Sequence, residues 1–200
     1  DLLALRGDYG NAIHHYTRSL ELKPGQVRIH INIGGCFQKE RKVAEAIEHY
    51  LLAIDHDPHQ VLAHTNLGLL FEQQHKTDEA TRYANLALKY NPDTVEAHTL
   101  LAKLDAREGR LDTALERLDN LLRKNMNAQQ RSSTLMAMGT MLDRNREFER
   151  SFACMTEAKK IFRSLHGVTE DTLSATRGTA SFRNTFTRDR TRTWHHERYN

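Results

Sequence analysis

Residues 61–94 read VLAHTNLGLLFEQQHKTDEATRYANLALKYNPDT, and this stretch decides the fold. Its first half places apolar residues at helical spacing, namely Ala63, Leu67, Leu70 and Phe71. A polar break follows at 75–78, and a second apolar face then appears, made of Ala80, Tyr83, Ala84, Ala87 and Leu88. Pro92 ends the second helix, because proline disfavours the helical conformation at the residue before it. The stretch therefore predicts two helices joined by a short turn.

The same pattern recurs along the chain with a 34-residue period. The only prolines are evenly spaced at this period, at Pro24, Pro58 and Pro92. Small residues fall in two fixed columns, Ala12, Ala46, Ala80 and Ala114, and Gly34, Gly68 and Ala102. After residue 126 the register resumes with three extra residues, so that Gly139 continues the column of Ala102, and we expect this insertion to form a loop at 125–130. Regular spacing of this kind indicates an internal repeat.

Small side chains in fixed columns have a physical purpose. Two helices approach closely only where side chains are small, and larger neighbours then interdigitate around them. One helix pair cannot bury its apolar face alone, whereas stacked pairs bury a continuous core. Stacking explains how a chain with 38% hydrophobic residues can fold.

These columns resemble the tetratricopeptide repeat family, as do the 34-residue period and turns such as Gly7-Asp8-Tyr9 followed by Ala12 and Pro24. The resemblance implies an all-α fold, an α-solenoid in which antiparallel helix pairs stack into a right-handed superhelix. We expect about five repeats over 1–165, at about 1–26, 27–60, 61–94, 95–128 and 132–165. We expect residues 166–200 to form a capping helix and a basic, Thr/Arg-rich linker or tail.

Composition and motifs exclude several functional classes. The net charge of +3 is too small to indicate a nucleic-acid-binding protein, and no apolar run approaches the roughly 18 residues of a membrane helix. Phosphate-binding loops, nucleophile elbows and zinc-protease motifs are absent from the sequence, so we expect neither an enzyme nor a cofactor. Cys36 and Cys154 form no zinc motif and indicate a reducing compartment, so we expect a cytoplasmic protein.

The resemblance also implies a binding surface, because first helices of these repeats line a concave groove where partners bind. The corresponding candidate peptide-binding residues are Arg28, Asn32, Gln38, Lys39, Thr65, Asn66, Leu69, Gln73, Thr99, Lys103 and Arg107. Asn32 and Asn66 share one register, and a carboxamide both donates and accepts hydrogen bonds, so the pair suits a peptide backbone. This resembles the asparagine ladder in the repeats of O-linked N-acetylglucosamine transferase. The alternative is that both are ordinary exposed asparagines.

Histidines also align at the repeat spacing, at His30, His64 and His98. Packed helices lie about 8–10 Å apart, so ligands on three layers cannot converge on one metal ion. We therefore interpret the three histidines as interhelical packing residues and expect no metal site. Asp105 stands where Phe37 and Phe71 predict an apolar residue. We expect Asp105 to pair with a basic neighbour such as Lys103 or Arg107, or else to shape the groove.

The two ends of the sequence depart from the repeat pattern. Residues 1–6 fit the latter part of a first helix, so we expect a truncated first repeat whose uncovered apolar face favours self-association. Residues 177–200 contain six arginines, and Phe182 and Phe186 are spaced to pack from one helix face onto the last repeat. Contact with nucleic acid is the lesser alternative for this segment, because its arginines are sparse.

The leading hypothesis is a protein–protein interaction scaffold that binds an extended peptide or partner protein in the concave groove. Acidic Glu72 and Glu96 accompany the basic groove residues, which favours polar contacts to a peptide backbone over a strongly acidic tail. The alternative is a non-catalytic N-terminal repeat region of a larger enzyme, such as a sulfotransferase linked to tetratricopeptide repeats. That second resemblance rests on composition alone.

Overall fold

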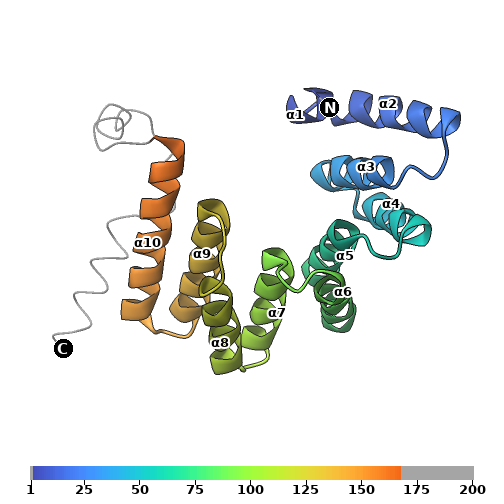
Figure 1. Cartoon of the computed structure of the whole chain (residues 1–200). Helices are drawn as coiled ribbons and strands as arrows, with labels where there is room; N and C mark the ends of the chain where they lie inside the picture. Colours follow the sequence, from blue (N-terminus) through green and yellow to red (C-terminus); the bar gives the residue numbers. More distant parts are fainter. Residues whose placement is uncertain (1, 168–200) are drawn as a thin grey trace.

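The computed structural model describes residues 2–167, and every regular element in this range is an α-helix (Figure 1). Ten helices follow one another within it: α1 (Leu2–Leu5), α2 (Tyr9–Leu22), α3 (Val27–Lys39), α4 (Val43–His56), α5 (Val61–Gln73), α6 (Thr77–Tyr90), α7 (Val95–Arg107), α8 (Leu111–Leu122), α9 (Ala128–Arg144) and α10 (Phe148–His166). They form pairs that stack in chain order, from α1–α2 to α9–α10. The predicted all-α solenoid is confirmed.

The prolines end the second helices of the first three pairs, as the sequence predicts. The residue before each proline has an extended backbone, with φ −143° at Lys23, −147° at Asp57 and −141° at Asn91. The N–H of each of these residues still donates to a carbonyl four residues earlier, which satisfies one of the helix's last acceptors. The first helices of the next pairs then begin at equivalent positions of the repeat, at Val27, Val61 and Val95.

The turn inside each pair is the same in all five pairs. One residue there has a positive φ, at Gly7 (82°), Arg41 (61°), His75 (59°), Gly109 (81°) and Arg146 (65°). The N–H of the following residue donates to the carbonyl five residues before it, as in Lys42 to Phe37 and Glu147 to Leu142, both at 2.9 Å. This is a left-handed helix termination that reverses the chain within a few residues. The shared turn shows that the fifth pair follows the same plan as the others.

The two helices of a pair touch where the small-residue columns meet. The four alanines of the first column are completely buried, at Ala12, Ala46, Ala80 and Ala114. In the fifth pair Ser151 takes the alanine position, and its hydroxyl donates to the carbonyl of Gly139 at 2.9 Å. A side-chain hydrogen bond to the facing helix backbone requires close approach. The hydroxyl therefore keeps the small-residue contact while satisfying its own polarity.

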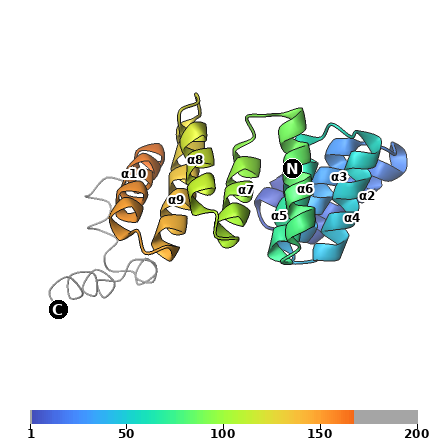
Figure 2. The same cartoon turned by 90° about the horizontal axis from the view of Figure 1, so that it is seen from below.

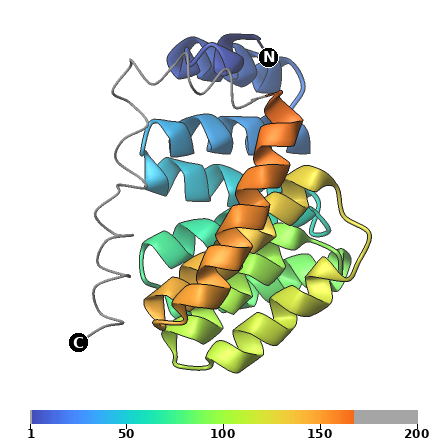
Figure 3. The same cartoon turned by 90° about the vertical axis from the view of Figure 1, so that its left-hand side faces the viewer.

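Buried residues form clusters that cross from one pair to the next. One cluster joins α3 and α4 to α5, a second joins α6 to α7, and a third joins α7 and α8 to α9. First helices also contact each other directly, α5 with α7 and α7 with α9. Figure 2 shows the pairs arranged side by side, and Figure 3 views the stack from the α10 end. The core is thus shared between neighbours, as a stacked repeat requires.

Residues 125–127 are irregular, as predicted, whereas residues 128–130 already belong to α9, which corrects the second half of the predicted loop at 125–130. Helix α9 has 17 residues, whereas α3, α5 and α7 have 13 each. The added turn begins at a capping box, in which Asn127 accepts from the N–H of Gln130 and Gln130 accepts from the N–H of Asn127. This reciprocal pair satisfies two free N–H groups and starts the helix one turn early.

A column of rings fills the space between the two helices of the second pair. Phe37, His49, His30 and His56 follow in that order, with neighbouring ring centroids 5.5, 5.4 and 5.6 Å apart. In the third pair the equivalent positions hold Phe71, Tyr83, His64 and Tyr90, at 5.4, 6.0 and 5.6 Å. His30 and His64 are both buried, which confirms the packing role predicted for them.

The second pair differs from the third because its column contains three histidines. Nδ1 of His30 lies 3.2 Å from Nδ1 of His49. Burial lowers the pKa of His30, and the neighbouring His49 and His56 lower it further. Burial also lowers the pKa of His49, against a smaller opposing effect of Glu48. Folding therefore favours the neutral form of His30 and His49.

Parts of the chain lie outside this description. The capping helix and basic tail are predicted for residues 166–200. Residues 168–200 lie outside the described part of the chain. Within residues 2–167 no helix has both the length and the apolar character needed to cross a bilayer.

The close contact in the second pair predicts opposite effects of alanine at two adjacent glycines. A Cβ on Gly34 would lie 2.8 Å from Cε1 of the buried Tyr50 ring, whereas one on Gly35 would meet only the Tyr50 hydroxyl oxygen, at 3.8 Å. Gly34→Ala should lower the free energy of unfolding by about 1–2 kcal/mol, because the ring has to move. Gly35→Ala should leave it unchanged or raise it by up to about 1 kcal/mol, through helix propensity. Urea denaturation measures both, and equal effects would contradict the close approach.

The histidine column predicts a loss of stability in mild acid. A histidine whose pKa is lowered by folding binds its proton more tightly in the unfolded chain. Its contribution to the free energy of unfolding is therefore complete above the ordinary histidine pKa of about 6.5. That contribution decreases as the pH drops below this value. His49→Tyr with His56→Tyr copies the third-pair column and should reduce the fall in Tm between pH 7.5 and 5.5 by roughly 2 °C or more. Tyr83→His with Tyr90→His is the matched control and should enlarge that fall. An unchanged pH dependence in both variants would contradict this account.

Candidate functional site

The candidate site is one stripe of side chains on the first helices of the pairs. Positions four, seven and eleven residues after Arg28 on α3 share a helix face with it, and the pattern recurs on α5 and α7. We call the surface formed by these stripes on α3, α5 and α7 the first-helix face. Because α5 contacts α7 directly, side chains from different repeats come within reach of each other there.

On α3 the structure leaves three of the four candidates exposed, namely Arg28, Asn32 and Lys39. Gln38 is half-buried, and its Oε1 accepts a hydrogen bond from the hydroxyl of Tyr50 at 3.2 Å. Gln38 therefore fixes a tyrosine of the following helix in addition to bordering the first-helix face.

On α5 the candidates differ in how far they are accessible. Thr65 is only 3% exposed, and its hydroxyl donates to the carbonyl of Val61 at 2.8 Å. Asn66 and Leu69 are half-buried, and Leu69 packs against the core cluster of α6 and α7. Gln73 is exposed. Thr65 is thus part of the interior, whereas Asn66 and Gln73 present polar groups at the surface.

Each asparagine of the proposed pair lies beside a tyrosine of the preceding repeat. Burial raises the pKa of Tyr50 to about 12, and a side-chain hydrogen bond with Asn66 opposes that rise. Burial likewise raises the pKa of Tyr16, and a side-chain hydrogen bond with Asn32 opposes it. The two Tyr–Asn contacts therefore occupy equivalent positions in successive repeats. At the next position Leu100 is buried and reaches over Gly68, which ends the series.

On α7 the structure brings two candidates together around a carboxylate of α5. Lys103 Nζ lies 2.9 Å from Oε1 of Glu72, and Arg107 Nη1 lies 2.5 Å from the same oxygen. The Glu72 side chain is only 6% exposed, whereas those of Lys103 and Arg107 are 39% and 37% exposed. The hydroxyl of Thr99, the third candidate on this helix, donates to the carbonyl of Val95 at 2.8 Å. Glu72 thus holds two cations of the next repeat at the surface.

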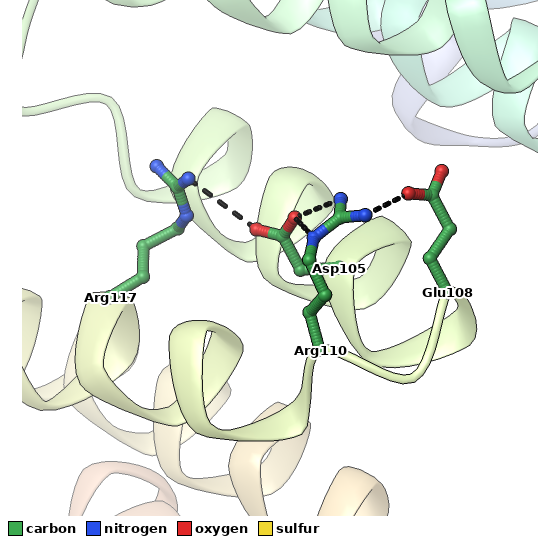
Figure 4. A network of polar contacts seen from close by, with 4 residues as sticks. All are labelled: Asp105, Glu108, Arg110 and Arg117. Carbon is green, nitrogen blue, oxygen red and sulfur yellow. Dashed lines mark hydrogen bonds and ion pairs between the residues drawn. The ribbon is translucent and has the colours of Figure 1, made fainter.

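Asp105 pairs with basic residues, but with different ones from those expected (Figure 4). Its Oδ1 accepts from Nε and Nη2 of Arg110 at 3.1 and 2.6 Å, and its Oδ2 lies 3.4 Å from Nη2 of Arg117. Lys103 and Arg107 pair with Glu72 instead. Residues two apart on a helix do not face each other, so neither of them can reach Asp105. Asp105 therefore lies away from the first-helix face.

Sequence profiles decide the family. Two profiles, both of the tetratricopeptide repeat, match the sequence over residues 1–61 and residues 71–138. The chain belongs to the tetratricopeptide repeat family. No curated protein matches it significantly.

Solved structures share the tetratricopeptide repeat fold at low sequence identity. MamA is 17% identical with a TM-score of 0.64, over 84% of this chain and 96% of MamA. PilF of Pseudomonas aeruginosa is 19% identical with a TM-score of 0.67, over 86% of this chain and 83% of PilF. YrrB, described as a TPR protein with an unusual peptide-binding site, is 19% identical with a TM-score of 0.57, over 83% of this chain and 86% of YrrB. These likenesses show the shared fold.

Comparison of the fourth repeat with the third shows what replaces the apolar residue at Asp105. Asp105, Arg117 and Lys124 of the fourth repeat occupy the positions of Phe71, Tyr83 and Tyr90 in the third. Asp105 contacts Arg117, and Lys124 contacts Asp93 at 2.6 Å. Ion pairs therefore replace the ring column in this repeat.

One role on the first-helix face was not visible as such in the sequence. The sequence pattern places Glu72 among the groove residues, whereas the structure buries it beneath two cations. The alignment of successive repeats contains the information that points to this role. The position equivalent to Glu72 in the next repeat is Ala106, and Lys103 and Arg107 lie on either side of it on the next first helix.

Other surface features of the described residues do not join this site. No group of three histidine, cysteine or acidic side chains is arranged to hold a metal ion within residues 2–167. An open polar pocket lies between α8 and the start of α10, and it contains none of the candidate residues. Its lining mixes acidic and basic side chains, including Asp112, Glu116, Asp119, Arg123 and Arg150.

The replacement of rings by ions predicts coupling between Asp105 and Arg117. Asp105→Phe alone should lower the free energy of unfolding by about 1–2 kcal/mol, because half-buried Arg117 loses its carboxylate and its Nε already has no hydrogen-bond partner. Arg117→Tyr alone should also destabilise. The double variant copies Phe71 and Tyr83 and should recover about 1 kcal/mol or more relative to the sum, in a double-mutant cycle by urea denaturation. Simple additivity would contradict the equivalence of the two arrangements.

Proposed function

We propose that this tetratricopeptide repeat protein, an interaction scaffold by its fold, binds an extended peptide along the first-helix face. Exposed polar groups on that face come from successive repeats, including Arg28 and Asn32 on α3 and Gln73 on α5. The likeness to YrrB, which is described as having a peptide-binding site, agrees with this proposal.

The register of the two asparagines carries the proposal. Asn32 and Asn66 take equivalent positions on the successive first helices α3 and α5, and both side chains reach the surface. Packed helices of successive repeats lie about 8–10 Å apart, and three residues of an extended chain span about 10 Å. One asparagine per repeat therefore matches every third residue of an extended peptide.

The cellular setting is part of the proposal. Cys36 and Cys154 are not joined in a disulfide, and burial raises the pKa of both thiols, which disfavours their oxidation. We infer a reducing, cytoplasmic location from them. Self-association and linkage to an enzyme domain stay hypotheses, because no described contact bears on either.

Alanine at both asparagines tests the proposed peptide contact. An array of unrelated synthetic decapeptides is probed with the labelled full chain. The wild-type chain should bind a subset of the peptides. The double variant Asn32→Ala with Asn66→Ala should weaken these signals about tenfold, because each carboxamide contributes a polar contact of about 1 kcal/mol. Its Tm should stay within about 2 °C of the wild-type value. Asn85→Ala, at an exposed position on α6, is the matched control and should bind like wild type.

Two outcomes would contradict the proposal. Absence of any peptide binding by wild type would refute peptide recognition altogether. Equal binding by the asparagine variant and by wild type would remove Asn32 and Asn66 from the contact.

A further inference from the structure

Burial changes the charge that the first-helix face presents to a ligand. The sequence places Glu72 and Glu96 among the basic side chains, which suggests a mixed surface. In the structure Glu72 is 5% exposed and its Oε1 already contacts two cations, so it offers no accessible negative charge. Among charged stripe residues, Glu96 remains as the exposed acid, against Arg28, Lys39, Lys103 and Arg107. The accessible part of this face is therefore basic.

The cations around Glu72 keep hydrogen-bonding capacity for a ligand. In these ion pairs each cation contacts a single oxygen of Glu72. An ammonium has three N–H donors and a guanidinium has five, so most of their donors remain open. Two positive charges against one negative leave a local excess of +1. One more carboxylate would complete the pairing of Lys103 and Arg107.

Charge also differs between the two kinds of helix in the second, third and fourth pairs. The first helices of these pairs, α3, α5 and α7, contain four basic and three acidic residues. The second helices, α4, α6 and α8, contain three basic and eight acidic residues. A negatively charged ligand is attracted by the first set and repelled by the second, which raises its rate of encounter with the first-helix face and disfavours binding elsewhere.

We propose that the partner segment is acidic and that one of its Asp or Glu carboxylates binds between Lys103 and Arg107, with Glu72 as the positioning residue for both cations. This deepens the proposed function and rests on it. An acidic peptide suits the site better than a nucleic acid does, because the face offers few cations and they are widely separated, at 28, 39, 103 and 107. The carboxylate replaces water on two half-exposed donors, and the asparagines contact the peptide backbone.

Three matched peptides separate this inference from the proposed function. The probes are fluorescein-labelled decapeptides of alternating alanine with glutamate, glutamine or lysine, measured by fluorescence anisotropy with the full chain. The glutamate peptide should bind at least about tenfold more tightly than the glutamine peptide, and the lysine peptide should bind most weakly. Raising sodium chloride from about 0.05 M to about 0.5 M should remove most of the glutamate preference.

Variants are chosen so that no charge is left buried alone. Removing Lys103 or Arg107 singly endangers folding, because buried Glu72 would lose a partner. Glu72→Gln combined with Lys103→Gln keeps the local excess at +1 and should still reduce the glutamate preference about fivefold or more, since the two-cation arrangement is lost. Glu79→Gln with Lys89→Gln, at exposed positions on α6, likewise removes one acid and one base; it is the charge-matched control and should keep the preference. Arg28→Gln with Lys39→Gln, at exposed positions without ion pairs among the described residues, should reduce it without affecting Tm.

Each outcome decides between the two proposals. Equal binding of the glutamate and glutamine peptides, or a glutamate preference that survives in the Glu72/Lys103 variant, would overturn the acidic-ligand inference. Array binding that depends on Asn32 and Asn66 would in that case leave the proposed function standing. Tighter binding of a uridine decanucleotide than of the glutamate peptide, through the same cations, would also overturn the inference in favour of RNA.

Discussion

The structure depends on the close approach of two helices within each pair. Alanine or serine on the second helix and glycine or alanine on the first leave no room for a larger side chain at the crossing. Around that crossing the large side chains interdigitate, as Tyr50 does over Gly34. Since each crossing recurs after a fixed number of residues, every pair offers its neighbour the same apolar surface, and the core continues through the stack.

Because the helix crossing depends only on its small residues, the side chains next to it differ between repeats. The space occupied by a ring column in the second and third repeats is bridged by Asp105 and Arg117 in the fourth, with no change in the turn geometry. The second repeat has histidines in that space, and the lowered pKa values of His30 and His49 predict that its packing weakens in mild acid. The first-helix face varies in the same way, from exposed asparagine and arginine on α3 to cations held by Glu72 on α7. The proposed function therefore rests on side chains that the crossing does not use.

Features set by the local chain were predictable from sequence, and features set by contacts between repeats were not. The prolines and the alanine columns act through backbone conformation and side-chain size within each pair, and their recurrence every 34 residues makes them visible in the sequence. The partners of Asp105 depend on which way it points from α7, and two-residue neighbours on a helix point elsewhere. The burial of Glu72 depends on the position of α7 against α5. The early start of α9 depended on a capping box, Asn127 with Gln130, that the sequence contains but that the repeat register obscured.

The central claim is that ligands contact the first-helix face, and amide NMR tests it most directly. Side-chain amide signals of Asn32 and Asn66 are followed while the glutamate–alanine decapeptide is added to the isotope-labelled chain. The account predicts that both signals shift and that the backbone shifts concentrate in 27–39, 61–73 and 95–107. Shifts confined to α4, α6 and α8, with Asn32 and Asn66 unmoved, would contradict it.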